Sequence, residues 1–541
     1  MPRQSNILCG EGELIPEINF SMGELMLMQL ETHGSRTAQI NAHTGKVQTF
    51  QDIVDTSRKL AVFLKKQGIG VNDTVAVCSE NNLEFCIPVC AAFYLGAIAC
   101  PLNPLYSEGE LKHALNISKP KYIFISPLAL NSFRNVYRDL HWSPRVLMLV
   151  DHGSNNDAPW ASVPEIISGI SSNDANALQA VPVDVADHVT VILCSSGTTG
   201  LPKGVMLTDK NITTVIRIHL SNTISTISED SVSLGLLPFF HAYSFLVMIL
   251  TLLRGNCSIV FSHFEQELFL QYVEKYKIEY LPVVPSLMVF LAKHPLVDKY
   301  DLSCVKGVWS GAAPLSKEIQ NAVAKRLNIT EVKQGYGLTE TTLAVLGSTD
   351  KIKPGSVGVL LPGISAKVIP IGEFETDKAL GPNCRGELCF KGDLIMKGYY
   401  NDEKSTRETI DKDGWLHTGD VGYYDEEGFF YIVDRIKELI KYKGYQVPPA
   451  ELEAILLSCP GVQDAAVIGI PNDKVGELPV AFVVKEDNSN ICEKNVIQYV
   501  NERVSNPKRL RGGVRFVDSI PKTPSGKILR RVLRDRLKSK L

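Results

Sequence analysis

The sequence predicts an α/β fold followed by a smaller α+β unit, and three observations lead to this prediction. Short apolar runs alternate with helical patterns through the first part of the chain, which is typical of α/β units on a mainly parallel sheet. After Gly355 the strands become shorter and Gly/Pro turns separate them, which indicates a β-rich subdomain. From Ile440 onward, helical and strand patterns mix. Because 541 residues are too many for one compact core, two or more domains are expected.

The individual elements follow from the same patterns. In the α/β part we predict strands at 74–79, 121–125, 146–150, 189–193, 279–284 and 305–309, and helices at 50–67, 108–116 and 286–293. In the last unit we predict helices at 449–458 and 493–504, and strands at 464–468 and 480–484. The charged segment 434–438 separates the two kinds of pattern, so the predicted domains are 1–435 and 436–541.

The composition is that of a globular protein with no strong electrostatic field. It is 45% hydrophobic and 21% charged, with a net charge of −3, so it does not suggest binding to nucleic acid or to an anionic membrane. Its 12 cysteines show no zinc-ligand spacing. Cys78, Cys86, Cys90 and Cys100 fall in apolar segments, which predicts buried free thiols and a reducing compartment.

The two ends and the most apolar segment bear on targeting. The first residues lack the apolar region of a signal peptide, and the apolar run 245–253 is too short to span a bilayer. The chain ends in Ser539-Lys540-Leu541, which matches a peroxisomal import address. We therefore expect a peroxisomal location and recognition by the import receptor.

The most informative motif is the Ser-Ser-Gly-Thr-Thr-Gly-Leu-Pro-Lys-Gly segment at 195–204, directly after the predicted strand 189–193. A glycine- and hydroxyl-rich loop that leaves a strand can turn several backbone N–H groups toward one anion. This predicts a phosphate-binding loop. It is not a Walker A loop, because Lys203 follows a proline and precedes a glycine.

A second motif, Gln-Gly-Tyr-Gly-Leu-Thr-Glu-Thr at 334–341, carries complementary groups. Two glycines flank Tyr336, so its ring can be held against a flat ligand such as a purine. Thr339 offers a hydroxyl at phosphate height, and Glu340 a carboxylate suited to Mg²⁺.

Three further segments contain charged residues that are unremarkable when each is taken alone. Asp420 ends the segment Gly-Trp-Leu-His-Thr-Gly-Asp, and Arg435 follows it at a distance; a carboxylate can accept hydrogen bonds from both hydroxyls of a ribose. Lys527 ends Pro-Ser-Gly-Lys in a basic neighbourhood. The segment 441–447 has lysines on both sides of Tyr442, typical of an exposed hairpin edge.

In this order and at this spacing, the five motifs resemble the signatures of the adenylate-forming enzymes. This superfamily includes acyl-CoA synthetases, 4-coumarate–CoA ligases and beetle luciferases, and the resemblance covers essentially the whole chain. It implies a large N-terminal domain of two doubly wound α/β subdomains plus a β-barrel-like subdomain, and a small mobile C-terminal α+β domain. Together with the Ser-Lys-Leu end, the run from Pro238 to Tyr243 looks closest to insect luciferase-like fatty acyl-CoA synthetases.

The resemblance also implies ATP, Mg²⁺ and coenzyme A as ligands and assigns residues to each. Lys527, Thr339, Glu340 and Lys441 are implied as catalytic, with Glu340 holding the metal, Asp420 the ribose and Lys437 at the hinge. Lys441, Lys443 and Gly444 are implied to line the passage for coenzyme A. The implied ATP site comprises Ser195, Ser196, Gly197, Thr198, Thr199, Gly200, Lys203, Gln334, Gly335, Tyr336, Gly337, Thr339, Asp420, Arg435 and Lys527.

The implied acid-binding pocket departs from the luciferase pattern. Its residues are His241, Tyr243, Gly311, Ala312, Ala313 and Leu343. Leu343 stands where similar luciferases usually have serine, and Lys333 where they tend to have arginine. An apolar side chain at 343 favours an alkyl tail, at about 0.8 kcal/mol per buried CH₂.

We therefore expect an ATP-dependent acyl-CoA synthetase for medium- to long-chain fatty acids, which forms an acyl-adenylate and then an acyl-CoA. Luciferin 4-monooxygenase and an aryl-CoA ligase of the coumarate type are the alternatives within the superfamily. A non-catalytic nucleotide sensor is disfavoured because Glu340, Asp420, Arg435 and Lys527 are all present. A peptide-synthetase module is disfavoured because no carrier domain follows.

Overall fold

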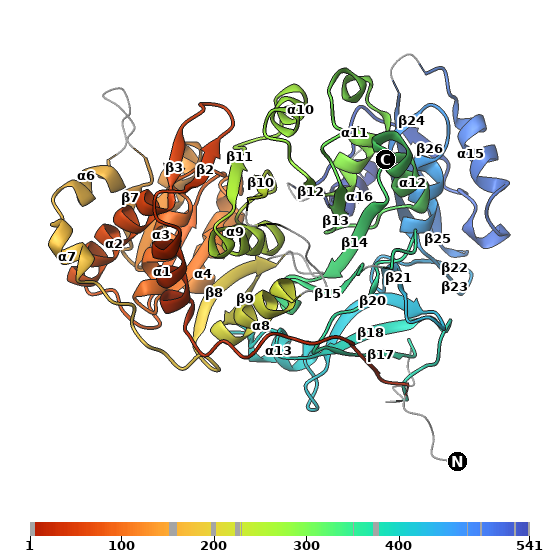
Figure 1. The fold of residues 1–541 in the computed structure, drawn as a ribbon. Helices are drawn as coiled ribbons and strands as arrows, with labels where there is room; N and C mark the ends of the chain where they lie inside the picture. The colour runs from red at the N-terminus through yellow and green to blue at the C-terminus, as the bar shows by residue number, and fades with distance from the viewer. Residues whose placement is uncertain are drawn as a thin grey trace.

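The computed structural model describes residues 6–150, 159–195, 202–221, 228, 230–349, 351–371, 378–472, 474–486, 489–523 and 526–538. Figure 1 shows the first part of the chain as a broad sheet-and-helix lobe, the middle part beside and below it, and the C-terminal part on the opposite side. The mixed α/β architecture predicted from the sequence is confirmed.

The first lobe is built on a seven-stranded sheet in the order β19-β9-β8-β5-β4-β6-β7. The run from β8 to β7 is parallel, while β9 and β19 pair antiparallel. The strands are β4 (Thr74–Cys78), β5 (Ile98–Leu102), β6 (Tyr122–Ile125), β7 (Arg145–Met148), β8 (Val189–Ser195), β9 (Lys203–Thr208) and β19 (Gly398–Tyr399).

Helices cover both faces of this sheet, which explains why its central strands are apolar without interruption. In β4, Val75 and Val77 belong to the core under α1 (Met22–His33), α2 (Phe50–Lys66) and α3 (Cys86–Tyr94). Ala76 and Cys78, on the other face, pack under α4 (Glu108–Ser118) and α5 (Leu130–Arg138). A strand buried on both faces loses the polar alternation of a half-exposed strand.

The second lobe contains two smaller sheets, in the orders β10-β11-β2-β3 and β12-β13-β14-β15-β16. The first consists of β2 (Thr37–Asn41), β3 (Val47–Thr49), β10 (Val232–Gly235) and β11 (Cys257–Val260). The second consists of β12 (Tyr280–Val283), β13 (Gly307–Ser310), β14 (Glu331–Gly337), β15 (Ala344–Gly347) and β16 (Val359–Leu360). Helices α10 (Gln266–Lys275), α11 (Pro285–Lys293) and α12 (Lys317–Leu327) contribute to the core of this lobe. Helices α8 (Asp209–Leu220) and α9 (Ala242–Arg254) pack against α1, with many of their buried side chains in the core of the first lobe.

The β-rich stretch predicted after Gly355 forms a five-stranded antiparallel sheet in the order β1-β17-β18-β20-β21. Strand β1 (Leu8–Cys9), from the start of the chain, closes one edge of it. The other strands are β17 (Ser365–Ile369), β18 (Gly386–Lys391), β20 (Leu416–Tyr424) and β21 (Phe430–Arg435), and α13 (Glu403–Thr409) precedes β20.

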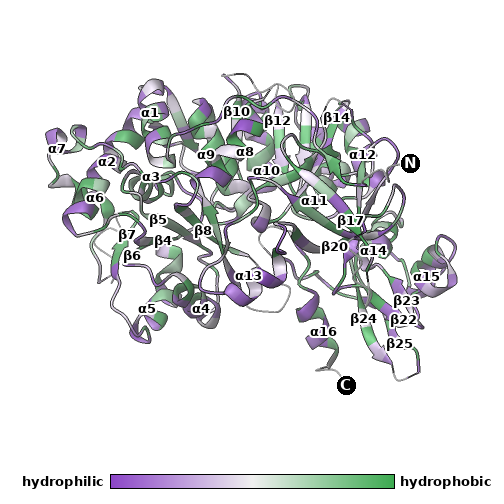
Figure 2. Cartoon of the chain, turned by 90° about the horizontal axis from the view of Figure 1, so that it is seen from below, coloured by the Kyte–Doolittle hydropathy of each residue, from purple (hydrophilic) through white to green (hydrophobic). Residues whose placement is uncertain are grey.

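The C-terminal unit is a small sheet in the order β23-β22-β25-β24, with β26 beside β25. It comprises β22 (Ile440–Tyr442), β23 (Tyr445–Val447), β24 (Val462–Asn472), β25 (Gly476–Lys485), β26 (Val514–Phe516), α14 (Pro449–Leu457), α15 (Glu493–Asn501) and α16 (Arg530–Lys538). In Figure 2 the strands β24 and β25 carry hydrophobic residues, while α16 is mostly hydrophilic.

Three predicted elements in this unit need correction. Strand β25 begins at Gly476 instead of Val480, because its pairing with β24 continues to Gly476. Strand β24 is longer than predicted because its antiparallel pairing with β25 continues past Pro471 to Asn472; the proline lies near the end of the ribbon. Helix α15 ends at Asn501 instead of Val504, because a turn follows and leads into the 3₁₀ segment Asn506–Lys508.

The prediction of buried free thiols is confirmed. All 12 cysteines are free, and the four predicted as buried thiols are buried. In the described part of the chain, no helix reaches the length and hydropathy that crossing a bilayer requires.

Candidate active site

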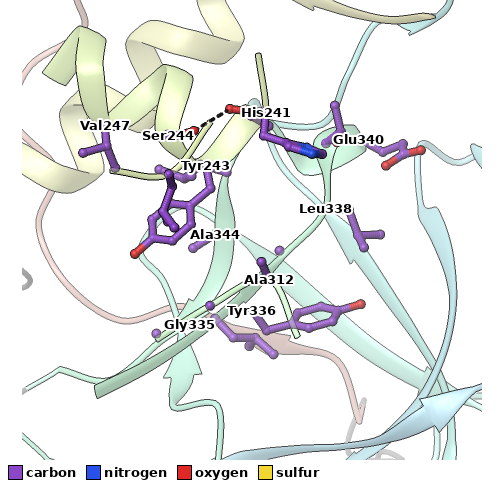
Figure 3. Close-up of a pocket in the computed structure, with 18 of the residues that line it drawn as sticks. His241, Tyr243, Ser244, Val247, Ala312, Gly335, Tyr336, Leu338, Glu340 and Ala344 are labelled. Atoms are coloured by element: carbon purple, nitrogen blue, oxygen red, sulfur yellow. Dashed lines mark hydrogen bonds between the residues drawn. The ribbon is translucent and has the colours of Figure 1, made fainter. Parts of the chain in front are cut away.

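A cavity of about 740 Å³ lies where the lobes meet, and most of the predicted site residues line it. Helix α9, strands β14, β20 and β21 and the segment around Lys527 all contribute walls. The predicted residues at the cavity are Ser195, Lys203, His241, Tyr243, Gly311, Ala312, Gln334, Gly335, Tyr336, Gly337, Thr339, Glu340, Leu343, Arg435, Lys437 and Lys527. Figure 3 shows Tyr243 and Val247 on the α9 side, and Leu338 and Glu340 on the opposite side.

Other predicted residues lie elsewhere. Among the described residues that line the cavity, neither Ala313 nor Asp420 is present. Lys441, Lys443 and Gly444 are also absent from its walls, and they lie on the hairpin of β22 and β23. Ser196, Gly197, Thr198, Thr199 and Gly200 lie outside the described residues, as do Ser539, Lys540 and Leu541.

The predicted phosphate loop joins two antiparallel strands. Ser195 at the end of β8 pairs with Lys203 at the start of β9, so these two residues of the motif lie side by side in the sheet. The Ser195 hydroxyl is buried without a hydrogen-bond partner in the described structure. On the exit side, the Nε2 of His113 lies 2.8 Å from the carbonyl of Pro202. The flanks of the loop are therefore fixed, and a buried hydroxyl stands at its base.

Tyr399 connects the lysine of this loop to Glu340. Its hydroxyl donates to Glu340 Oε1 at 2.9 Å, and the ammonium of Lys203 lies 4.7 Å from its ring centroid. Burial raises the pKa of the Tyr399 hydroxyl, with the Glu340 charge adding to the effect, so it stays a donor. One Glu340 oxygen is thus oriented by Tyr399, and a carboxylate held in this way suits a hard cation such as Mg²⁺.

Tyr336, Asp420 and Arg435 form a buried polar group beside the cavity. Asp420 on β20 and Arg435 on β21 face each other across the antiparallel pair, and Arg435 Nε lies 3.2 Å from Asp420 Oδ1. The Tyr336 hydroxyl donates to the other carboxylate oxygen at 2.7 Å. Burial raises the pKa of Asp420 even though Arg435 opposes the shift. The geometry places Asp420 behind Tyr336, with Arg435 itself at the cavity.

Lys527 reaches the cavity from the C-terminal unit on a tight turn. Thr523 N donates to the Lys527 carbonyl at 2.8 Å, Lys527 N donates to the Thr523 hydroxyl at 3.0 Å, and Gly526 has a φ of +82°. A Cβ on Gly526 would meet Ser286 and Val284 of the large unit. Burial and the charge of Arg435 lower the pKa of Lys527 to about 8.

Ion pairs within the C-terminal unit, and contacts of Lys293 across the interface, support this position of Lys527. Arg534 lies 2.9 Å from Glu438 in the connecting turn that also contains Lys437, and Arg530 lies 3.0 Å from Glu453. On the large unit, Lys293 donates to the carbonyl of Val462 at 2.9 Å. The two arginine pairs hold α16 within the C-terminal unit. Lys293 crosses the interface, since its ammonium also lies 3.2 Å from Glu486, and this contact helps to keep Lys527 at the cavity.

The hairpin that contains Lys441 is turned away from the cavity. Lys443 and Gly444 both have positive φ, at 48° and 81°, between the paired residues Tyr442 and Tyr445. Two central residues of positive φ make the type I′ turn that fits a two-residue hairpin. In this arrangement the hairpin is exposed, and a role toward coenzyme A requires the C-terminal unit to rotate.

Comparison with known proteins identifies the framework. Residues 27–400 match the family model described as AMP-binding enzyme, and residues 451–527 match the AMP-binding enzyme C-terminal domain. The chain belongs to the AMP-binding enzyme family. With its large N-terminal and small C-terminal matches, it is an adenylate-forming enzyme of the acyl/aryl-CoA ligase superfamily.

Individual members of the family align over nearly the whole chain. It is 44% identical to luciferin 4-monooxygenase from Photuris pensylvanica, over 99% of both chains. It is 39% identical to 4-coumarate–CoA ligase 2 from Nicotiana tabacum, over 93% of this chain and 92% of that one. The structure of ATP-bound MatB from Rhodopseudomonas palustris aligns with a TM-score of 0.84 at 27% identity, over 96% of this chain and 99% of that one.

In this AMP-binding enzyme the structure adds site residues that the sequence patterns missed. Tyr399 belongs to a short strand with no motif of its own, and its part follows only from the pairing of β19 with β9. Ala312, a predicted pocket residue, has a φ of 71° that the sequence did not indicate; this backbone conformation is uncommon for a residue with a Cβ. His219, Arg254 and Asn256 line the cavity as well. His219 lies in α8, Arg254 is the last residue of α9 and Asn256 follows that helix. No sequence motif includes these three residues.

Proposed function

We propose that this AMP-binding enzyme is an acyl-CoA synthetase that activates a medium- to long-chain fatty acid with ATP and transfers the acyl group to coenzyme A. The observation that supports it most directly is the extent of the cavity, which runs from Lys527 and Glu340 along α9 to Arg254. Val247, Leu250, Leu343 and Ala344 give it apolar walls. Such walls favour the burial of methylene groups.

In the first half-reaction, a carboxylate oxygen of the acid attacks the α-phosphorus of ATP, and the bond from that phosphorus to the pyrophosphate oxygen breaks. Lys527 and Arg435 lie at the cavity as cations that offset the negative charge that grows on the phosphates. His241 stays uncharged there, because burial and the charge of Lys527 lower its pKa to about 4. A neutral His241 leaves the cations free to act on the phosphates.

Glu340 is the residue that would hold Mg²⁺, since its carboxylate lines the cavity and Tyr399 orients one of its oxygens. When bound, the ion would neutralise phosphate charge. In the second half-reaction the thiol of coenzyme A attacks the acyl carbon, the acyl–oxygen bond breaks and AMP leaves. The exposed hairpin with Lys441, Lys443 and Gly444 would enter the site for this step, with Lys437 at the hinge.

Luciferin 4-monooxygenase is the second candidate, and the 44% identity to the Photuris enzyme favours it. An aryl-CoA ligase is supported in the same way by the coumarate ligase relative. Leu343 at the cavity argues for an alkyl substrate over both. One preparation assayed with fatty acids, cinnamates and luciferin, each with ATP, Mg²⁺ and coenzyme A, tests all three. Acyl-CoA from fatty acids supports the proposal, and strong light emission with luciferin would overturn it.

Delivery to the peroxisome is part of the proposal, supported by the terminal Ser539-Lys540-Leu541. A fluorescent protein fused before residue 1 should locate to peroxisomes, and the same fusion without the last three residues should stay diffuse. Equal distribution of the two fusions would contradict this assignment.

A further inference from the structure

The face of α9 that lines the cavity changes character along its length. Tyr243, Val247, Leu250 and Arg254 all line the cavity, and their spacing of four, three and four residues places them on one side of the helix. At 1.5 Å per residue, the distance from Tyr243 to Arg254 along the axis is about 16 Å. The wall therefore begins at the reactive end, continues over apolar side chains and finishes at a guanidinium.

The surroundings of Arg254 are polar but lack a carboxylate. His219, Ser231, Ser233 and Asn256 line the same end of the cavity, and an Nη of Arg254 donates to the His219 carbonyl. Within the described residues, no carboxylate lies within ion-pair distance of Arg254, and burial alone lowers its pKa. His219 adds no charge, because burial lowers its pKa to about 4, with a smaller effect from Arg254.

Two other cations of the cavity differ from Arg254 in this respect. Lys333 lies 3.0 Å from Glu331, and Arg435 lies 3.2 Å from Asp420. For each of these two cations, the protein itself supplies a carboxylate partner. A half-buried guanidinium has lost part of its hydration, and a carboxylate is the group whose geometry matches its paired N–H donors.

We propose that Arg254 binds the distal carboxylate of a long-chain dicarboxylic acid, whose other carboxylate is activated at the Lys527 end. The inference rests on the proposed acyl-CoA synthetase function and names the substrate class within it. The methylene groups between the two carboxylates would pack against Val247, Leu250 and Leu343, which line the cavity between its ends. The distal carboxylate would then meet the guanidinium in a partly desolvated site, where such a pair is strongest.

The length of the wall sets the expected chain. A carbon chain with bonds of about 1.5 Å and angles of about 111° advances about 1.25 Å per carbon. The wall of about 16 Å therefore corresponds to roughly 13 carbons. Because the arginine side chain extends toward the ligand, dicarboxylic acids of about 10 to 13 carbons should fit, and much shorter ones should not reach Arg254.

The test compares matched pairs of mono- and dicarboxylic acids of the same length, for instance dodecanoate and dodecanedioate, by acyl-CoA formation with the full chain. The wild-type protein should prefer the diacid in kcat/KM. Arg254→Leu should lower kcat/KM for the diacid at least tenfold and leave the monoacid unchanged or improved. Arg254→Lys should retain part of the preference, and Lys494→Leu, at an exposed position of α15, should retain all of it.

The outcomes separate this inference from the proposed function. If the monoacid reacts well but the diacid does not, or if Arg254→Leu affects both acids equally, the role of Arg254 is refuted while the synthetase function stands. If neither acid forms a thioester although ATP is bound, the proposed function itself fails. Thermal stabilisation by dodecanedioate, measured for wild type and Arg254→Leu, supplies a binding readout that does not depend on turnover, and equal stabilisation would contradict the inference.

Discussion

The two ends of the cavity are built in different ways. The reactive end combines charged and hydroxyl groups from short contiguous segments, among them 334–341 and the turn before α16, and several of these groups contact one another: Tyr399 with Glu340, and Tyr336 with Asp420. The acyl end draws single side chains from α9, β10 and β15, and most of them are apolar. Activation of an acid is therefore set by local motifs, whereas the choice of acid is set by residues that only the fold brings together.

The largest effect that distinguishes the two ends is expected from Lys527→Ala. Removal of the ammonium takes away a positive charge at the phosphates, and the loss of one such electrostatic group typically costs about 10²–10³ in rate. The rate of pyrophosphate release should fall by that factor for every acid, while ATP binding measured by calorimetry changes little. Lys494→Ala, at an exposed residue of α15, is the matched control. Full-rate acyl-adenylate formation by Lys527→Ala would contradict the assignment.

A smaller and selective effect is expected at the acyl end from Leu343→Ser. The change removes apolar contact with an alkyl chain, at about 0.8 kcal/mol per CH₂ equivalent, so kcat/KM for dodecanoate should fall about three- to tenfold. The rate with a short acid such as butyrate should stay near that of the wild type, because a short chain does not reach the same wall. An equal loss for both acids would show that Leu343 does not act on chain selection.

The smallest expected effect is a pH dependence of kcat/KM, and it comes from a group at the reactive end, Lys527. The pKa of Lys527 is lowered to about 8 by burial and by Arg435, so its charge is present below that pH and is lost as the pH rises through it. The kcat/KM for ATP in pyrophosphate release should drop about twofold near pH 8 and further above it. Lys527→Arg keeps its charge in this range. A decline that persists unchanged in Lys527→Arg would assign the titration to another group.

The fold was predictable wherever one segment determines its own structure. Helix α2 begins at Phe50 as predicted, because Thr49 and Asp52 form a capping box, and the double-sided burial of β4 explains its uninterrupted apolar run. The length of β24 was not predictable, because its pairing with β25 overrides Pro471.

The site residues were likewise predictable where they belong to a motif. Lys527, Glu340 and Arg435 stand in motifs, and the structure places all of them at the cavity. Asp420 is in a motif as well, but its position behind Tyr336 depends on the register of β20 and β21. Tyr399 and Arg254 have no motif: one acts through Glu340 and Lys203, and the other ends a helix whose cavity-lining face only the packing reveals. Sequence patterns do not show which segments far apart in the chain contact each other.

The central claim is that the cavity selects an alkyl acid, and a competition experiment tests it most directly. The protein is given dodecanoate and 4-coumarate at equal concentration with limiting coenzyme A, ATP and Mg²⁺, and the two thioesters are quantified by mass spectrometry. The product ratio equals the ratio of the kcat/KM values. The account predicts a large excess of dodecanoyl-CoA. An excess of coumaroyl-CoA would contradict it.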